Sequence, residues 1–201
     1  MITSLPDVSE VPALGFDGWR TWFEYAAMAV MAAVPDDGVA IFFQTDIRRE
    51  GVWVDKGTLV AAAAAKTGME LLFHKIVCRL PPGTATFGRA SFSHLLGFGR
   101  QPRPVLRGSA DVLSDAGFKP GTKSMGVNAC LEACRFVLAE TPSRTIVDPF
   151  CGLGTVLAVA NALGMEAIGV DLSVRMVRKA QLLRIDPGHV PGRVHGAGAG
   201  R

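Results

Sequence analysis

The sequence contains no long uninterrupted apolar segment. Its longest apolar run, residues 25–34, has ten residues, whereas a membrane-spanning helix needs about 20. The first ten residues, MITSLPDVSE, also lack the basic residues that open a secretory signal. We therefore expect a soluble, cytoplasmic protein without a membrane segment.

Cysteine and surplus charge are also scarce. The four cysteines have no CxxC spacing and are too few for a disulfide framework. His74 and His94 lie on neighbouring predicted strands without an accompanying acid or thiolate set, so we predict no metal site. With 49% hydrophobic residues and a formal charge of +3 over 201 residues, the chain is neither disordered nor strongly basic.

Strand and helix patterns alternate along the chain. Helical spacing of apolar residues predicts a helix over 19–34, and short apolar runs predict strands at 39–44 and 71–78. Other strands are predicted at 1–4, 91–98, 145–150 and 166–171, and other helices at 57–67, 125–139, 156–163 and 174–184. This alternation favours an α/β fold whose mostly parallel sheet binds a ligand at the carboxyl ends of its strands.

The stretch TIVDPFCGLGT predicts a strand, a tight turn and the start of a helix. Gly152 and Gly154 permit positive φ and the close approach of a ligand. The next strand ends in Asp171, 171 − 154 = 17 residues after the second glycine. A carboxylate at that place can accept hydrogen bonds from the ribose hydroxyls of a nucleoside cofactor.

The turn does not match the common phosphate-binding loops. Leu157 occupies the position of the third glycine in a dinucleotide fingerprint, and no GK[ST] follows the turn. Asp148, at the start of the turn, would repel a pyrophosphate but suits a ligand with an ammonium and a sulfonium. These features point to S-adenosylmethionine.

DPFCGLGT, with an apolar strand before it and GVDLS after it, resembles the cofactor motif of Rossmann-like S-adenosylmethionine-dependent methyltransferases. It is most similar to the permuted DNA and RNA amino-methylases, in which the substrate motif comes first. The resemblance covers roughly residues 1–185 and implies one domain, with 186–201 as a flexible tail. The implied fold is a doubly wound, mostly parallel sheet in permuted order with an antiparallel edge hairpin. One strand that normally precedes the substrate motif has no room here, so about six strands are expected.

The resemblance also implies the cofactor contacts. Asp148 and the turn would line the methionine end, Asp171 would hold the ribose, and Lys123 and Ser124 would lie near the methionine carboxylate. The full implied set is Asp148, Pro149, Phe150, Cys151, Gly152, Gly154, Thr155, Asp171, Leu172, Lys123 and Ser124.

The related methylases carry [DNS]PP[YFW] at a strand end, where the polar residue and a prolyl carbonyl hold the target amino group. The matching text is Ser4-Leu5-Pro6-Asp7, in which Leu5 replaces the first proline and Asp7 the aromatic that stacks on an extruded base. We predict Ser4, Pro6 and Asp7 as catalytic, with Asp7 accepting a hydrogen bond or a proton from an incoming amine or hydroxyl. The alternative is that Asp7 and Ser9 cap a turn or a helix start.

A basic stretch, Lys75 to Arg107, contains no acid and is interleaved with Phe87, Phe92 and Phe98. Basic residues with aromatics suit nucleic acid; the alternative is a solvated hairpin whose phenylalanines face the core. The basic residues are Lys75, Arg79, Arg89, Arg100, Arg103 and Arg107.

The sequence thus predicts an S-adenosylmethionine-dependent methyltransferase acting on nucleic acid, with RNA slightly ahead of DNA. One alternative is a degenerate member that binds nucleic acid or a protein partner without catalysis. Another is an NAD(P)-dependent oxidoreductase, against which Leu157 argues. The sheet edge left by the missing strand would favour a homodimer.

Overall fold

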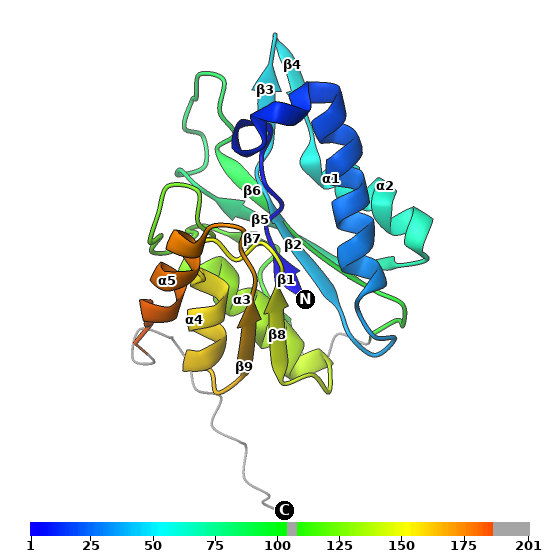
Figure 1. The fold of residues 1–201 in the computed structure, drawn as a ribbon, viewed down its shortest axis with the longest axis vertical. Helices are drawn as coiled ribbons and strands as arrows, with labels where there is room; N and C mark the ends of the chain where they lie inside the picture. The colour runs from blue at the N-terminus through cyan, green and yellow to red at the C-terminus, as the bar shows by residue number, and fades with distance from the viewer. Residues whose placement is uncertain (104–107, 187–201) are drawn as a thin grey trace, which may run out of the picture.

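The computed structural model describes residues 1–103 and 108–186. Its main sheet has the strand order β1-β2-β6-β5-β7, in which β6 is antiparallel to both neighbours and the other two pairs are parallel. A second, parallel pair, β8 and β9, lies beside β1 (Figure 1). The bounds are β1 Ile2–Thr3, β2 Ala40–Gln44, β5 Glu70–Cys78, β6 Phe92–Gly99, β7 Val112–Leu113, β8 Thr145–Asp148 and β9 Glu166–Gly169.

Helices cover both faces of the sheet (Figure 1). On β2, Ala40 and Phe42 pack into a core with α1 and α2, whereas Ile41 and Phe43 pack into a second core with α3 and α4. This alternation follows from the two-residue period of a strand. It confirms the doubly wound α/β fold. The helices are α1 Gly15–Ala32, α2 Lys56–Thr67, α3 Val127–Glu140, α4 Thr155–Ala162 and α5 Val174–Leu182.

Two features of the fold were not expected from the sequence. A short hairpin, β3 (Ile47–Arg49) and β4 (Val52–Val54), stands between β2 and α2. The strand β7 lies beyond the antiparallel hairpin β5–β6, so this hairpin is next to the sheet edge. Apart from these two features, β1 is connected to α1 by two short 3-10 helices, η1 (Val8–Glu10) and η2 (Pro12–Leu14).

The segment predicted to contact the substrate precedes the segment predicted to bind the cofactor, as in the permuted order. β1 comes first in the sequence and β8 much later, yet Thr3 Oγ1 donates a hydrogen bond to Asp148 Oδ1 at 2.6 Å. The carboxyl ends of β1 and β8 are therefore neighbours, which brings the segment after Thr3 to the glycine turn (Figure 1). Within the described ranges, no helix is long and apolar enough to cross a membrane. Residues 187–201 of the predicted tail lie outside those ranges.

Candidate active site

The glycine turn lies between β8 and α4. Gly152 has φ +52° and Gly154 has φ +73°, values that favour glycine over other residues. A Cβ on Gly152 would meet no atom within 4 Å, whereas a Cβ on Gly154 would lie 2.8 Å from the Ala180 Cβ of α5. Gly152 thus leaves open space above the turn, and Gly154 lets α5 pack against it.

Asp148 is buried at the start of the turn, with 1% of its surface exposed. The Thr3 hydroxyl and the Phe150 N–H both donate to Oδ1, at 2.6 and 3.1 Å. Burial raises the pKa of Asp148 to about 6, and these hydrogen bonds only partly offset it. The carboxyl therefore changes charge around pH 6.

Asp171 lies against the same turn. Its Oδ2 accepts a hydrogen bond from the Gly152 N–H at 3.0 Å, and its Oδ1 accepts one from the Ser173 N–H at 2.7 Å. Its charge is close enough to raise the pKa of Asp148 further. The two acids thus face one bend of backbone, and Leu172 beside them is fully exposed.

Several other residues predicted to bind the cofactor have side chains that pack around the turn. Cys151 is buried against Gly169, and burial raises the pKa of its thiol to about 11. The Phe150 ring packs edge-on against Trp22 of α1, with ring centroids 5.9 Å apart. Thr155 is buried at the start of α4. Pro149 follows Asp148 and is partly exposed.

Lys123 and Ser124 belong to the segment before α3. Its Gly121 lies against Leu153 of the glycine turn, so the segment borders the turn. Lys123 Nζ lies 3.6 Å from Glu10 Oε1 and 3.2 Å from Ser9 Oγ. Lys123 therefore connects the turn side of the site to η1 on the substrate side.

Asp7 lies in the loop that follows β1, which the sequence predicts to contact the substrate. Its Oδ2 lies 3.4 Å from Lys56 Nζ, while its Oδ1 is buried without a hydrogen-bond partner among residues 1–103 and 108–186. Asp7 also begins η1, because its backbone N–H donates to Glu10 Oε2 at 2.9 Å. The Asp7 carboxylate is thus paired with Lys56, and its side chain is 28% exposed in the loop after β1.

The other two predicted catalytic residues flank this loop. Ser4 is partly exposed directly after β1. The Pro6 carbonyl accepts a hydrogen bond from Trp19 Nε1 at 3.1 Å, which fixes the loop to α1.

Lys56 is a buried charge that the sequence did not single out. Only 4% of its side chain is exposed, and its Nζ lies 5.7 Å from the centre of the Trp19 ring. Burial lowers its pKa, and the carboxylate of Asp7 opposes that shift. Lys56 is therefore the counterion of Asp7.

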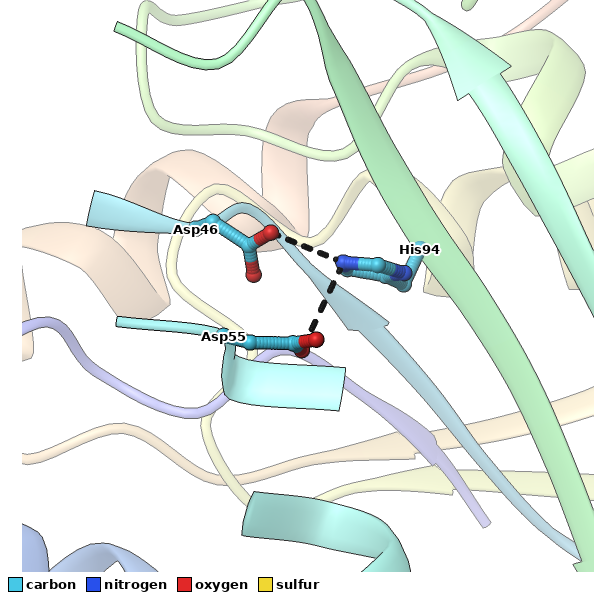
Figure 2. A group of neighbouring side chains, drawn as sticks. All are labelled: Asp46, Asp55 and His94. Atoms are coloured by element: carbon cyan, nitrogen blue, oxygen red, sulfur yellow. Dashed lines mark hydrogen bonds and ion pairs between the residues drawn. The ribbon is translucent and has the colours of Figure 1, made fainter. Parts of the chain in front are cut away.

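A second polar cluster consists of Asp46, Asp55 and His94 (Figure 2). It contacts Lys56 through the Lys56 N–H, which donates to Asp46 Oδ1 at 2.9 Å. His94 Nε2 is 3.0 Å from Asp46 Oδ2 and 3.8 Å from Asp55 Oδ1. On its other side, His94 Nδ1 is 2.9 Å from His74 Nε2. The two histidines do meet, and acids accompany one of them, so the premise of the no-metal prediction was wrong.

The protonation of this cluster follows from its contacts. Burial opposes the charged form of His94, but the hydrogen bond to Asp46 and the charges of Asp46 and Asp55 together outweigh burial and raise the pKa of His94. The pKa of His74 is lowered, first by burial and then by the charge of His94. Asp46 and Asp55 stand where β2 ends and α2 begins, and that placement is the sequence signal that could have found them.

The basic stretch does not form one surface. Lys75 is buried and pairs with Glu132 of α3 at 3.3 Å. Arg100 and Arg103 donate to backbone carbonyls at the opposite edge of the sheet, near the ends of α1 and α3. Arg79 and Arg89 remain at the carboxyl edge, in the loop of the fully exposed Phe87, while Phe92 is partly buried and Phe98 is in the core. Arg107 lies outside the described residues.

Comparisons with known proteins bear on the fold and on the segment from α3 to α5. A sequence model of a DNA methylase family, N6_N4_Mtase, matches residues 135–182, from within α3 to α5. No curated protein sequence matches the chain. The resemblance to the amino-methylating group is confirmed over this segment and in the fold.

Three solved structures share the fold, each aligned with 90% of this chain. TTHA0409 from Thermus thermophilus, assigned as a DNA modification methylase and complexed with S-adenosyl-L-methionine, has 18% identity and a TM-score of 0.66 over 82% of its length. The M1.HpyAVI complex with SAM has 14% identity and a TM-score of 0.59 over 85% of its length. The cytosine-N4-specific PvuII DNA methyltransferase has 14% identity and a TM-score of 0.65 over 77% of its length. The family model is that of a DNA methylase, and two of these three structures carry descriptions as DNA methylases, so the preference for RNA gains no support.

Proposed function

We propose that this chain is an S-adenosylmethionine-dependent methyltransferase that methylates an amino nitrogen of a base in DNA. The observation that carries the proposal is the junction of two segments far apart in the sequence. A glycine turn with two carboxylates, Asp148 and Asp171, lies directly beside the loop that holds Asp7, whose side chain is 28% exposed. A methyl donor and an amine acceptor need such adjacent sites.

The turn provides contacts suited to the donor. Asp148 Oδ2 takes part in neither hydrogen bond to that carboxyl, so we assign it to the ammonium of the methionine end. Asp171 can accept hydrogen bonds from the ribose, and the open space at Gly152 admits the nucleoside. The bound donor supplies a methyl group that its sulfonium already activates.

Asp7 acts on the acceptor. Its side chain is 28% exposed, so the carboxylate can accept a hydrogen bond from the target amino group, which orients the nitrogen lone pair toward the methyl carbon. As the nitrogen–carbon bond forms and the carbon–sulfur bond breaks, the surplus amino proton passes to this carboxylate or to water. The Lys56 ammonium, 3.4 Å from Asp7 Oδ2, fixes the position of this carboxylate.

DNA is proposed as the substrate because the matching family model is that of a DNA methylase. Arg79 and Arg89, on the loop after β5, lie at the same edge of the sheet as Asp7. Phosphate contacts by such residues supply much of the affinity of proteins for nucleic acid.

The test is methyl transfer from labelled S-adenosylmethionine to genomic DNA and to total RNA. We expect label in DNA, a loss of at least 100-fold in Asp7→Asn, and no loss in Asp37→Asn, an exposed acid at the opposite sheet edge. Label in RNA alone would overturn the choice of DNA.

The degenerate alternative keeps one observation in its favour, because Leu5 and Asp7 depart from the family motif. It predicts that the wild-type chain binds the cofactor but leaves both nucleic acids unlabelled. The same assay therefore separates the two functions.

A further inference from the structure

We propose that Asp46, Asp55 and His94 form a binding site for one divalent transition-metal cation, Zn²⁺ or Mn²⁺, at the carboxyl end of β2. Asp46 follows β2, Asp55 precedes α2, and His94 lies on β6 (Figure 2). The site lies outside the glycine turn and the Asp7 loop, so it does not rest on the proposed methyl transfer.

The three donor atoms are close enough to share a cation. One carboxylate oxygen of each aspartate and one imidazole nitrogen all lie within 4.8 Å of one another. His94 Nε2 is 3.0 Å from Asp46 Oδ2 and 3.8 Å from Asp55 Oδ1. Because such ligands bind Zn²⁺ at about 2.0–2.2 Å, small shifts of the two carboxylates suffice. The cation takes the place of the proton between His94 and Asp46, which is released to solvent.

Neighbouring groups already hold the ligands in place. His94 Nδ1 can donate to His74 Nε2, 2.9 Å away, which leaves the Nε2 lone pair for the cation. Trp53 Nε1 and the Lys56 N–H donate to Asp46 at 3.0 and 2.9 Å. Both of these hydrogen bonds can persist when a cation is bound. Metal-ligating side chains are usually supported in this way.

An unpartnered amide marks the same place independently. Gln44 is 1% exposed, and its Nε2 has no hydrogen-bond partner within residues 1–103 and 108–186. Gln44 is paired in register with His94 on the neighbouring strand, so both side chains lie on one face of the sheet. A site with three protein ligands usually keeps a water on the cation, and such a water is the acceptor that this amide lacks.

The site is reachable from solvent and has a fitting charge. Asp55 has 46% of its side chain exposed and lines an open groove with Phe16, Arg49 and Trp53. Two carboxylates and a neutral imidazole carry a charge of −2, which matches a divalent cation. This mixture of oxygen and nitrogen donors suits Zn²⁺ or Mn²⁺ better than Mg²⁺.

Calorimetric titration of the full chain with ZnCl₂ tests the site. We expect one Zn²⁺ per chain, with affinity at least 30-fold lower in Asp55→Asn and in His94→Gln. Two control variants, Asp37→Asn and the double variant His189→Gln/His195→Gln, should bind within twofold of the wild type. His74→Gln should weaken binding about tenfold, because it removes only the supporting hydrogen bond.

A second measurement needs no variant and so does not depend on variant folding. Paramagnetic Mn²⁺ added to the wild-type chain should broaden the imidazole NMR signals of His94 and His74 before those of His189 and His195. No saturable one-site binding, equal affinity in Asp55→Asn, or first broadening at His189 and His195 would each overturn the proposal. S-adenosylmethionine binding to the metal-free chain is measured separately, so the failure of one proposal leaves the other standing.

Discussion

The carboxyl of Asp148 is more deeply buried than the side chain of any other residue assigned to the cofactor. Burial raises its pKa from 3.8 to about 6. Between these pH values the folded chain keeps a proton that the unfolded chain has lost. Its ionisation therefore destabilises the fold as pH rises from about 4 to about 6, by roughly 3 kcal/mol, and the loss persists above pH 6.

Asp148→Asn should separate stability from binding. The amide keeps an oxygen for Thr3 and Phe150, so we expect the variant to be about 2–3 kcal/mol more stable than the wild type at pH 7.5 and equal to it below pH 4. Urea unfolding at both pH values measures this difference. Cofactor affinity should fall at least tenfold. If the variant were only as stable as the wild type at pH 7.5, the ionised Asp148 carboxylate would not destabilise the fold.

Lys56 should matter for stability as well as for catalysis. Lys56→Gln leaves the partly buried Asp7 without its counterion, and we expect a loss of about 2–4 kcal/mol of unfolding free energy. Lys66→Gln is the matched control, because its ion pair with Glu24 is exposed and should contribute less than about 1 kcal/mol. Equal losses in urea unfolding would contradict the role of Lys56.

Site residues could be predicted from the sequence only where they lie close together along the chain. Asp148, Gly152 and Gly154 stand within one turn, so the motif reveals them. Asp46 and His94 are 48 positions apart and meet only because of the register between β2 and β6. No local pattern encodes that register, so the contact between Asp46 and His94 could not be predicted.

At the scale of elements, hydrophobic periodicity predicted most helices and strands to within a few residues. It failed for β3–β4, because each strand has three residues and the turn between them is Glu50-Gly51. Glu50 adopts φ +50°, a conformation uncommon for glutamate and not announced by an Asn-Gly or Asp-Gly pair. The helix α1 begins at Gly15, four residues before the predicted start.

Alanine substitution of three glycines with positive φ compares the energetic cost of backbone strain with that of a packing clash. Gly152→Ala and Gly164→Ala meet open space, so each should cost about 1–2 kcal/mol. Gly154→Ala should cost at least about 1 kcal/mol more, because its Cβ would clash with Ala180. Of the first two, only Gly152→Ala should weaken cofactor binding. Thermal unfolding measures the loss of stability, and calorimetric titration with S-adenosylmethionine measures cofactor binding. A loss of binding in Gly164→Ala would contradict the assignment of Gly152 to the cofactor site.

At the scale of the whole molecule, the carboxyl edge of the sheet is the face we propose for DNA. Replacing Arg89 with Ser should reduce the slope of log affinity against log salt by about 0.9, the effect of one phosphate contact. Arg144→Ser is the control, because Arg144 precedes β8 at the opposite edge. Fluorescence anisotropy with a DNA duplex at several salt concentrations gives both slopes. An unchanged slope in Arg89→Ser would place DNA elsewhere.

The outer edge of β9 bears on self-association. Within the described residues, β9 pairs only with β8, and Ile168 and Val170 are both 55% exposed. The homodimer expected from the sequence stays a prediction, and sedimentation equilibrium at several concentrations tests it.

Calorimetric titration of the wild-type chain with S-adenosylmethionine at pH 7.5 tests the central claim most directly. The account predicts one molecule bound per chain, with affinity at least tenfold lower in Asp148→Asn and in Asp171→Asn but unchanged in Asp7→Asn. An absence of binding heat from folded wild-type protein at near-millimolar concentration would contradict it.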